Sequence, residues 1–211
     1  MPAPLSRSSL EDFLDQLASN AATPGGGSTA ALAGALGAGL VSMVGNLTMG
    51  RPQFTAVEEE IGAMVAQSEA LRRRLTSLIE ADARAFEHVT QAMRMPRETD
   101  AAQAARTEAL QDSLKAAAIV PLQIADACRE VMTLAQQAAA DGNPNVISDA
   151  GVAMLMAESA LRSAALNVLI NLKFIQDKAF VDEHRSQLER LLEEAPDLRE
   201  NLYTTVLSEL Q

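Results

Sequence analysis

The sequence TPGGGSTAALAGALGAGLVSMVGNLTMG, residues 23–50, decides the fold. It consists mostly of small residues and carries no charge. At helical spacing these residues form two neighbouring stripes, so other helices can approach its backbone closely. The stripes are Ala30, Gly34, Ala38 and Ser42, and Gly27, Ala31, Ala35 and Gly39. We therefore expect a buried, central helix that is rich in Ala and Gly.

The uncharged run around this helix, residues 19–50, is longer than the roughly 20 residues that span a bilayer. It contains Asn20, Pro24 and Asn46, and it lacks flanking aromatic anchors and a basic bias at its ends. We expect no membrane span.

The composition excludes several classes of protein. The chain has 211 residues, of which 48% are hydrophobic and 3% aromatic, with 17 basic and 28 acidic residues and a net charge of -11. This charge argues against nucleic-acid binding, which needs a basic face. One cysteine and two histidines are too few for a disulfide or for most metal clusters. Glu11 and Asp12 lie where the apolar core of a signal peptide would begin, so we expect a cytoplasmic protein.

The rest of the chain also has helical periodicity, and no segment alternates with a period of two for long enough to predict a sheet. We expect an all-α, single-domain bundle of about five to seven helices over residues 1–211. Ser8 with Glu11 and Thr55 with Glu58 are capping-box patterns for the first and third helices. Long helices are expected at about 56–95, at about 98–140 with a kink near Pro121, and from about 148 past 178. Pro196 starts a last short helix that ends near residue 210.

Asp82 is the first candidate for chemistry. It lies on the apolar stripe of the third helix, four residues from both Leu78 and Phe86, so its carboxylate faces the expected core. Burial would raise the pKa of Asp82 and favour an acid/base role near neutral pH. A structural aspartate that pairs with an arginine or caps a helix is the alternative.

The three successive glycines of TPGGGS, Gly25, Gly26 and Gly27, precede the central helix together with Ser28. Unobstructed amides at a positive helix end can bind an anion. The motif is not a Walker A loop, because no lysine follows its last glycine. A tight turn that lets helices approach is the alternative.

A polar loop, residues 142–151, is the third candidate, because four polar side chains crowd in front of a helix. They are Asn143, Asn145, Ser148 and Asp149. Helix capping explains the same residue types. Asn167 and Asn171, four residues apart among aliphatic residues, are expected to form hydrogen bonds between helices.

Together these motifs resemble the cyclodeaminase/cyclohydrolase family of folate one-carbon metabolism. The family includes methenyltetrahydrofolate cyclohydrolases and the C-terminal domain of formiminotransferase-cyclodeaminase. The resemblance runs from about residue 10 to 172, through LASNAATPGGGS, DARAF, VPLQIADAC, NPNVISDAGVAM and ALNVLINL.

The resemblance implies a homodimeric enzyme that binds a tetrahydrofolate derivative as substrate, without a metal or any further cofactor. Asp82 matches the aspartate to which the resemblance assigns the acid/base role. Gly25, Gly26, Gly27 and Ser28 match the glycine-rich turn, and Asn143, Asn145, Ser148 and Asp149 match the polar loop. The resemblance places both segments near the folate.

Two reactions fit this reading. A cyclohydrolase adds water to 5,10-methenyltetrahydrofolate and gives 10-formyltetrahydrofolate, whereas a cyclodeaminase closes formimidoyltetrahydrofolate and releases ammonia. We favour the cyclohydrolase because no formiminotransferase segment is part of the sequence. A non-catalytic folate-binding helical dimer is a third possibility. Because folates are anions, we expect a neutral or positive pocket that includes helix-end amides and Arg51, Arg94 or Arg97.

Overall fold

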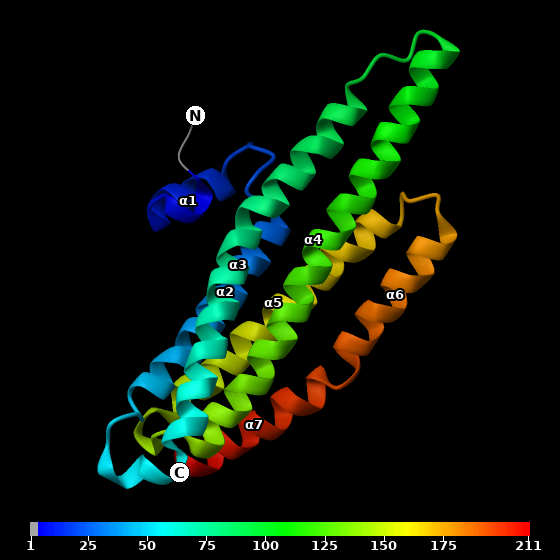
Figure 1. The fold of residues 1–211 in the computed structure, drawn as a ribbon. Helices are drawn as coiled ribbons and strands as arrows, with labels where there is room; N and C mark the ends of the chain where they lie inside the picture. Colours follow the sequence, from blue (N-terminus) through cyan, green and yellow to red (C-terminus); the bar gives the residue numbers. More distant parts are fainter. Residues whose placement is uncertain (1–3) are drawn as a thin grey trace.

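The computed structural model describes residues 4–211, and in this range the chain forms seven α-helices and no strand (Figure 1). The all-α prediction is confirmed. The helices are α1 (Leu10–Ala18), α2 (Gly26–Asn46), α3 (Glu58–Met93), α4 (Asp100–Asp141), α5 (Ile147–Leu172), α6 (Lys178–Glu193) and α7 (Ala195–Glu209). Three short 3₁₀ turns accompany them: η1 (Leu5–Arg7) precedes α1, η2 (Pro52–Val57) lies between α2 and α3, and η3 (Pro144–Val146) lies between α4 and α5.

Neither of the two predicted capping boxes forms. Helix α1 is capped by Ser9, whose Oγ accepts from the Asp12 amide at 3.0 Å, one residue later than expected. Thr55 caps nothing, because it lies inside η2 and its hydroxyl donates to the Pro52 carbonyl at 2.9 Å. Helix α3 starts three residues beyond it with an acidic first turn, which suits the positive end of a helix.

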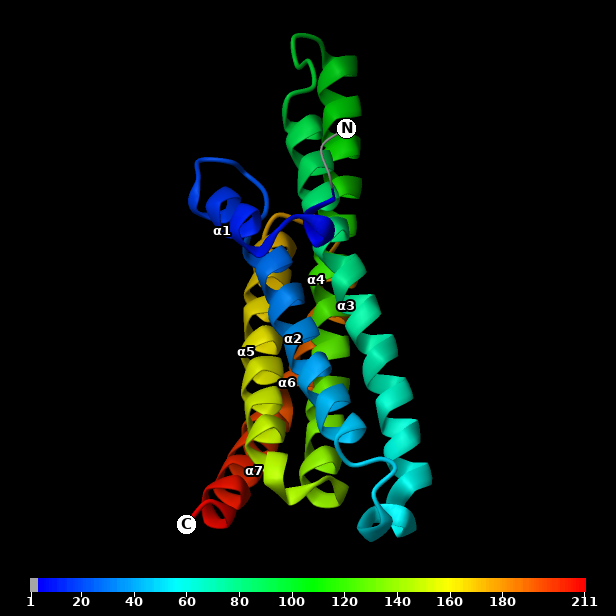
Figure 2. The ribbon, with the colours of Figure 1, turned by 90° about the vertical axis from the view of Figure 1, so that its left-hand side faces the viewer.

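Helix α2 packs against α3, α4 and α5 through its small residues. A Cβ on Gly37 would lie 3.1 Å from the Ala153 carbonyl oxygen of α5, so α5 can approach only because the side chain is missing. The prediction of a central, buried helix holds for the faces of α2 that pack against α3, α4 and α5, whereas its outer face is exposed. Figure 2 shows α2 and α5 together on one face of the bundle with α4 behind, and the outer face of α2 is open.

Pro121 lies inside α4 as predicted, and α4 remains one helix through it. A proline has no N–H, so the carbonyl four residues earlier, that of Ala117, loses its helical donor. The Asn171 side chain of α5 replaces that donor, because its Nδ2 donates to the Ala117 carbonyl at 3.0 Å. This bond between helices agrees with the prediction for Asn171.

The expected long helix from residue 148 past 178 is in fact two helices. Helix α5 ends at Leu172, and Asp177 caps α6 by accepting from the Phe180 amide at 3.1 Å. Helix α7 begins with Pro196 in its first turn and ends at Glu209, as predicted.

Within residues 4–211, two helical stretches are long and apolar enough to span a bilayer. They are Gly26–Asn46, with a mean hydropathy of 1.5, and Pro144–Leu172, with 1.3. The first is α2, and 61% of its most apolar window is buried inside the bundle. Its apolar character is thus largely used in packing against its neighbours, as in the core helix of a helical bundle.

Candidate active site

Asp82 of α3 faces the first turn of α2. The Ser28 hydroxyl lies 2.9 Å from Asp82 Oδ2 and 3.0 Å from the Ile79 carbonyl oxygen. When Asp82 is ionised, Ser28 can donate to it. When Asp82 is protonated, the carboxyl can donate to Ser28 Oγ while Ser28 donates to Ile79. Ser28 therefore accommodates both protonation states, as an acid/base residue requires.

Gly26 and Gly27 each make room for one polar side chain. A Cβ on Gly27 would overlap Oδ1 of Asp82, so only glycine permits the carboxylate at this place. A Cβ on Gly26 would lie 3.2 Å from Nδ2 and 3.3 Å from Oδ1 of Asn167 in α5. A Cβ on Gly25 would meet only the Ala22 carbonyl oxygen, at 3.9 Å. The glycine-rich turn thus brings α3 and α5 side chains to the start of α2.

Burial raises the pKa of the Asp82 carboxyl above its usual value. Hydrogen bonds from the Ser28 side chain and backbone oppose this shift but do not cancel it. No arginine or lysine pairs with Asp82 among the described residues. The first structural alternative, an aspartate paired with an arginine, therefore does not apply. The second, an aspartate that caps a helix, holds in part, because the Ser28 backbone in the first turn of α2 also hydrogen-bonds the carboxyl.

A cavity of about 290 Å³ opens beside Asp82. Asp82 is the one charged side chain among the described residues that line it. Eight apolar lining residues come from α3, α4, α5 and the turn after α5; they are Ala85, Phe86, Val89, Met93, Leu114, Ala117, Ile170 and Phe174. Ala22, Thr23 and the three glycines of the glycine-rich turn line the side at the start of α2. Phe86, which lies on the apolar stripe that we expected to face the core, is 47% exposed because it lies at this cavity instead. Met93, also at the cavity, is 53% exposed.

Asn167 and Asn171 also line the cavity, although we did not predict them as site residues. Their apolar neighbours in the sequence suggested packing between helices. The sequence does not show which helices face these two side chains. In the structure, Asn167 lies against the first turn of α2 and Asn171 against the middle of α4.

The polar loop does not reach Asp82 within this chain. The Asn143 amide donates to Thr48 Oγ1 at 2.9 Å, and Asn143 Nδ2 donates to the Leu47 carbonyl at 3.2 Å. These partners lie just past the C-terminal end of α2, which has 21 residues. At about 1.5 Å per residue, the loop is roughly 30 Å from the glycine-rich turn.

The arginines expected around the substrate are also elsewhere. Arg51 precedes η2, at the same end as the polar loop, and Arg94 and Arg97 lie in the exposed turn after α3. None of the three lines the cavity. A cation does lie near it, since Lys173 Nζ is 5.8 Å from the centroid of the Phe174 ring.

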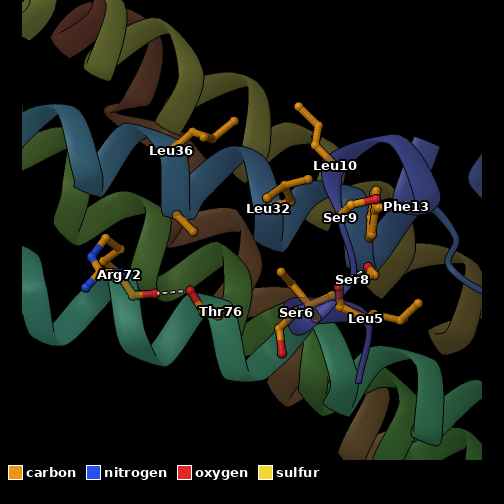
Figure 3. Close-up of a pocket in the computed structure, with 12 residues that line it drawn as sticks. Leu5, Ser6, Ser8, Ser9, Leu10, Phe13, Leu32, Leu36, Arg72 and Thr76 are labelled. Carbon is orange, nitrogen blue, oxygen red and sulfur yellow. Dashed lines mark hydrogen bonds between the residues drawn. The ribbon is translucent and has the colours of Figure 1, made fainter. Parts of the chain in front are cut away.

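A second cavity, of about 380 Å³, lies between the N-terminal segment and helices α2 and α3 (Figure 3). The arginine and the threonine that line it already have partners. Arg72 donates to Glu69 at 2.7 and 2.9 Å, which lowers the pKa of Glu69 to about 2, and Thr76 Oγ1 donates to the Arg72 carbonyl at 2.7 Å. We therefore place the candidate active site at Asp82.

Comparisons with known proteins identify the family of the chain. The family model described as formiminotransferase-cyclodeaminase matches residues 9–190. A methenyltetrahydrofolate cyclohydrolase of Methylorubrum extorquens is 51% identical over 95% of this chain and 97% of its own length. The formimidoyltransferase-cyclodeaminase of Rattus norvegicus is 40% identical over 89% of this chain, which matches 35% of the rat protein.

Among solved structures, the formiminotetrahydrofolate cyclodeaminase of Thermotoga maritima superposes with a TM-score of 0.81 at 32% identity, and the match covers 98% of this chain and 97% of that one. The fold and most of the sequence therefore agree with one set of relatives. This chain belongs to the formiminotransferase-cyclodeaminase family, the family that its motifs resemble.

Proposed function

We propose that the protein is a methenyltetrahydrofolate cyclohydrolase in which Asp82 is the general acid and base. The single observation that carries this proposal is the Asp82 carboxyl itself, raised in pKa, held by Ser28 and facing a cavity of about 290 Å³. The identity of 51% with a cyclohydrolase that this chain matches almost end to end supports the same reaction.

The reaction needs one proton acceptor that later becomes a donor. Water adds to the methenyl carbon between N5 and N10 while Asp82 takes a proton from it, so a C–O bond forms and the C–N π bond opens. The hydroxyl then loses its proton to solvent as the formyl C=O forms, the bond from carbon to N5 breaks, and Asp82 returns its proton to N5. The formyl group remains on N10, and one proton is released in total.

Asp82→Asn tests this mechanism. Asn keeps the size of the side chain but cannot take the proton, so we expect kcat to fall by about 10²–10⁴-fold. The measurement is the loss of methenyl-folate absorbance above the spontaneous rate, with circular dichroism to verify folding. Asp112→Asn, on an exposed position of α4, is the matched control. An Asp82→Asn enzyme as fast as the wild type would exclude the acid/base role.

A cyclodeaminase is the second candidate, favoured by the rat relative and the Thermotoga maritima structure. In that reaction N10 attacks the formimino carbon on N5, and ammonia leaves after receiving a proton, which Asp82 can also supply. Ammonia release from formimino-folate, measured beside methenyl-folate hydrolysis, separates the two activities.

We also propose that the enzyme needs no metal or other cofactor. The residues that line the cavity in the described chain include one carboxylate and no His or Cys, fewer ligands than a protein metal site normally has. Activity should therefore persist after dialysis against a chelator. A cytoplasmic location is proposed as well, because Cys128 is the one cysteine of the sequence and is a free, buried thiol, so the chain has no internal disulfide of the kind that exported proteins use. Cell fractionation tests it.

We further propose a homodimer that forms through the outer face of α2. Apolar and small residues recur on this face with alternating spacings of four and three, the pattern of a helix seam. They are Thr29, Ala33, Leu36, Leu40, Met43 and Leu47. Leu36 is 52% exposed, Met43 36% and Leu47 37%, and the apolar surface continues onto α5 at Leu155 and Leu166.

A second copy of this chain fits the seam because a two-fold axis lets one face cover itself. With the axis perpendicular to α2, the two copies of the helix run antiparallel. The polar loop of one chain then lies at the Asp82 end of the other. Asn145, Ser148 and Asp149 could in this way complete the folate site, as the family resemblance implies.

Two experiments test the dimer. Leu36→Glu should convert a dimer into a monomer by light scattering, with Leu207→Glu on α7 as an exposed control. Mixed dimers of an Asp82→Asn chain and an Asn145→Ala chain should regain activity if the loop acts across the interface. Mixed dimers no more active than the two parents would place the loop's function within one chain.

A further inference from the structure

Pro121 is buried in α4, and it leaves the carbonyl of Ala117 without a helical donor. Asn171 Nδ2 fills this place at 3.0 Å and also donates to the Asn167 carbonyl at 2.8 Å. Both N–H groups of the Asn171 carboxamide are thus used. If the amide were turned over, its oxygen would face two carbonyl oxygens, so the orientation is fixed by chemistry.

The remaining atom of this carboxamide, Oδ1, is an acceptor with a fixed position. Among residues 4–211, no buried side-chain polar atom lacks a hydrogen-bond partner, and the side-chain bonds of Asn171 are those of Nδ2. Oδ1 is therefore accessible, and Asn171 lines the cavity that contains Asp82.

We propose that Asn171 positions the substrate by accepting a hydrogen bond at Oδ1, and that Pro121 holds Asn171 in place by leaving the Ala117 carbonyl free. This inference rests on the proposed folate function. Pro121 does not line the cavity, so it is a positioning residue that acts only through Asn171.

The chemistry of the walls identifies the group that Asn171 would recognise. Phe86 and Phe174 offer flat, aromatic contacts and Ile170 an aliphatic one, which suit a ring. In the proposed mechanism Asp82 acts on the one-carbon bridge of the substrate. Asn171 Oδ1 is a neutral acceptor, which can bind an N–H group of the ring. The reduced pteridine of a folate has such N–H groups, and a ring analogue without them would leave Oδ1 unpaired and bind more weakly.

Two substitutions and their combination test whether Pro121 acts on substrate binding through Asn171. Asn171→Ala should raise the KM for methenyl-folate about tenfold, the effect of losing one hydrogen bond, with kcat changed less than about threefold. Pro121→Ala restores an N–H that competes for the Ala117 carbonyl, so it should raise KM about threefold while the Tm stays the same or rises. In the Asn171→Ala background, Pro121→Ala should have no further effect on KM.

Matched controls are available on α7. Asn201→Ala removes an exposed asparagine, and Pro196→Ala replaces a proline of the first helical turn, where its N–H is not needed. Both should keep the wild-type KM. A general loss of packing would instead lower the Tm of Pro121→Ala.

The results distinguish this inference from the proposed function. A wild-type protein that consumes neither methenyl-folate nor formimino-folate contradicts the proposed function. An active wild type with an unchanged KM in Asn171→Ala overturns the role of Asn171. Additive effects of Pro121→Ala and Asn171→Ala on KM overturn the role of Pro121.

Discussion

Polar side chains that the sequence singles out lie near both ends of α2, but the two groups have different roles. At the N-terminal end, Asp82 has a raised pKa and faces a cavity. At the C-terminal end, Asn143 is 2% exposed, donates to Leu47 and Thr48, and accepts from the Asn145 amide at 3.1 Å. Polar density alone does not indicate chemistry. A polar group whose hydrogen-bonding capacity the fold leaves unused is a better indicator of chemistry.

Gly27→Ala should give the largest effect at the N-terminal end. Its Cβ would occupy the place of the Asp82 carboxylate, so the carboxyl must move and kcat/KM should fall by about 100-fold or more. Gly25→Ala should cost less, since its Cβ has space. Gly62→Ala, an α3 glycine with nothing within 4 Å of its Cβ, is the control and should stabilise α3 by about 0.5–1 kcal/mol. Equal losses at residues 25 and 27 would contradict this account.

Ser28→Ala should lower kcat/KM about tenfold at neutral pH, the effect of one hydrogen bond to a charged group. It should also shift the pH profile. The hydrogen bond from the Ser28 hydroxyl lowers the pKa of Asp82, so its loss raises that pKa and moves the acidic limb of kcat/KM to higher pH. A shift to lower pH would mean that Asp82 is not the group that titrates.

Asn143→Ala should destabilise the protein at the C-terminal end of α2, whereas Asn145→Ala should not. Removing the buried Asn143 side chain leaves the Leu47 carbonyl without its donor and should lower the free energy of unfolding by about 1–3 kcal/mol. Asn145 is exposed, and its substitution should leave stability unchanged. Urea unfolding measures both. If Asn143→Ala impairs catalysis without changing stability, the structural role assigned to Asn143 is incorrect.

The smallest effect concerns stability and its dependence on pH. Because the folded protein raises the pKa of Asp82, the folded state binds more protons than the unfolded state between the two pKa values. Wild-type stability should therefore fall as pH rises through this window, and Asp82→Asn should remove that fall. The variant should be more stable than the wild type at neutral pH, with a difference that vanishes in acid. Thermal unfolding at several pH values checks the sign.

The helices and Asp82 were predictable because both depend on local periodicity. The apolar stripe of α3 shows that residue 82 points inward before any partner is known. The roles of the other polar residues depend on which helices meet. Asn171 contacts Ala117 across 54 residues of sequence, and Asn143 contacts Thr48 across 95. The break between α5 and α6 was missed because residues 173–177 have no proline or glycine, and Asp177 gives only a single capping signal.

The close approach of Gly27 to Asp82 also has an evolutionary consequence. A chain that keeps the aspartate can accept only glycine at position 27, whereas a chain that has lost it is free to place a side chain there. The two positions should therefore change together among descendants of this fold. A homologue with any larger residue in place of Gly27 can be identified from its sequence as one that has given up this chemistry.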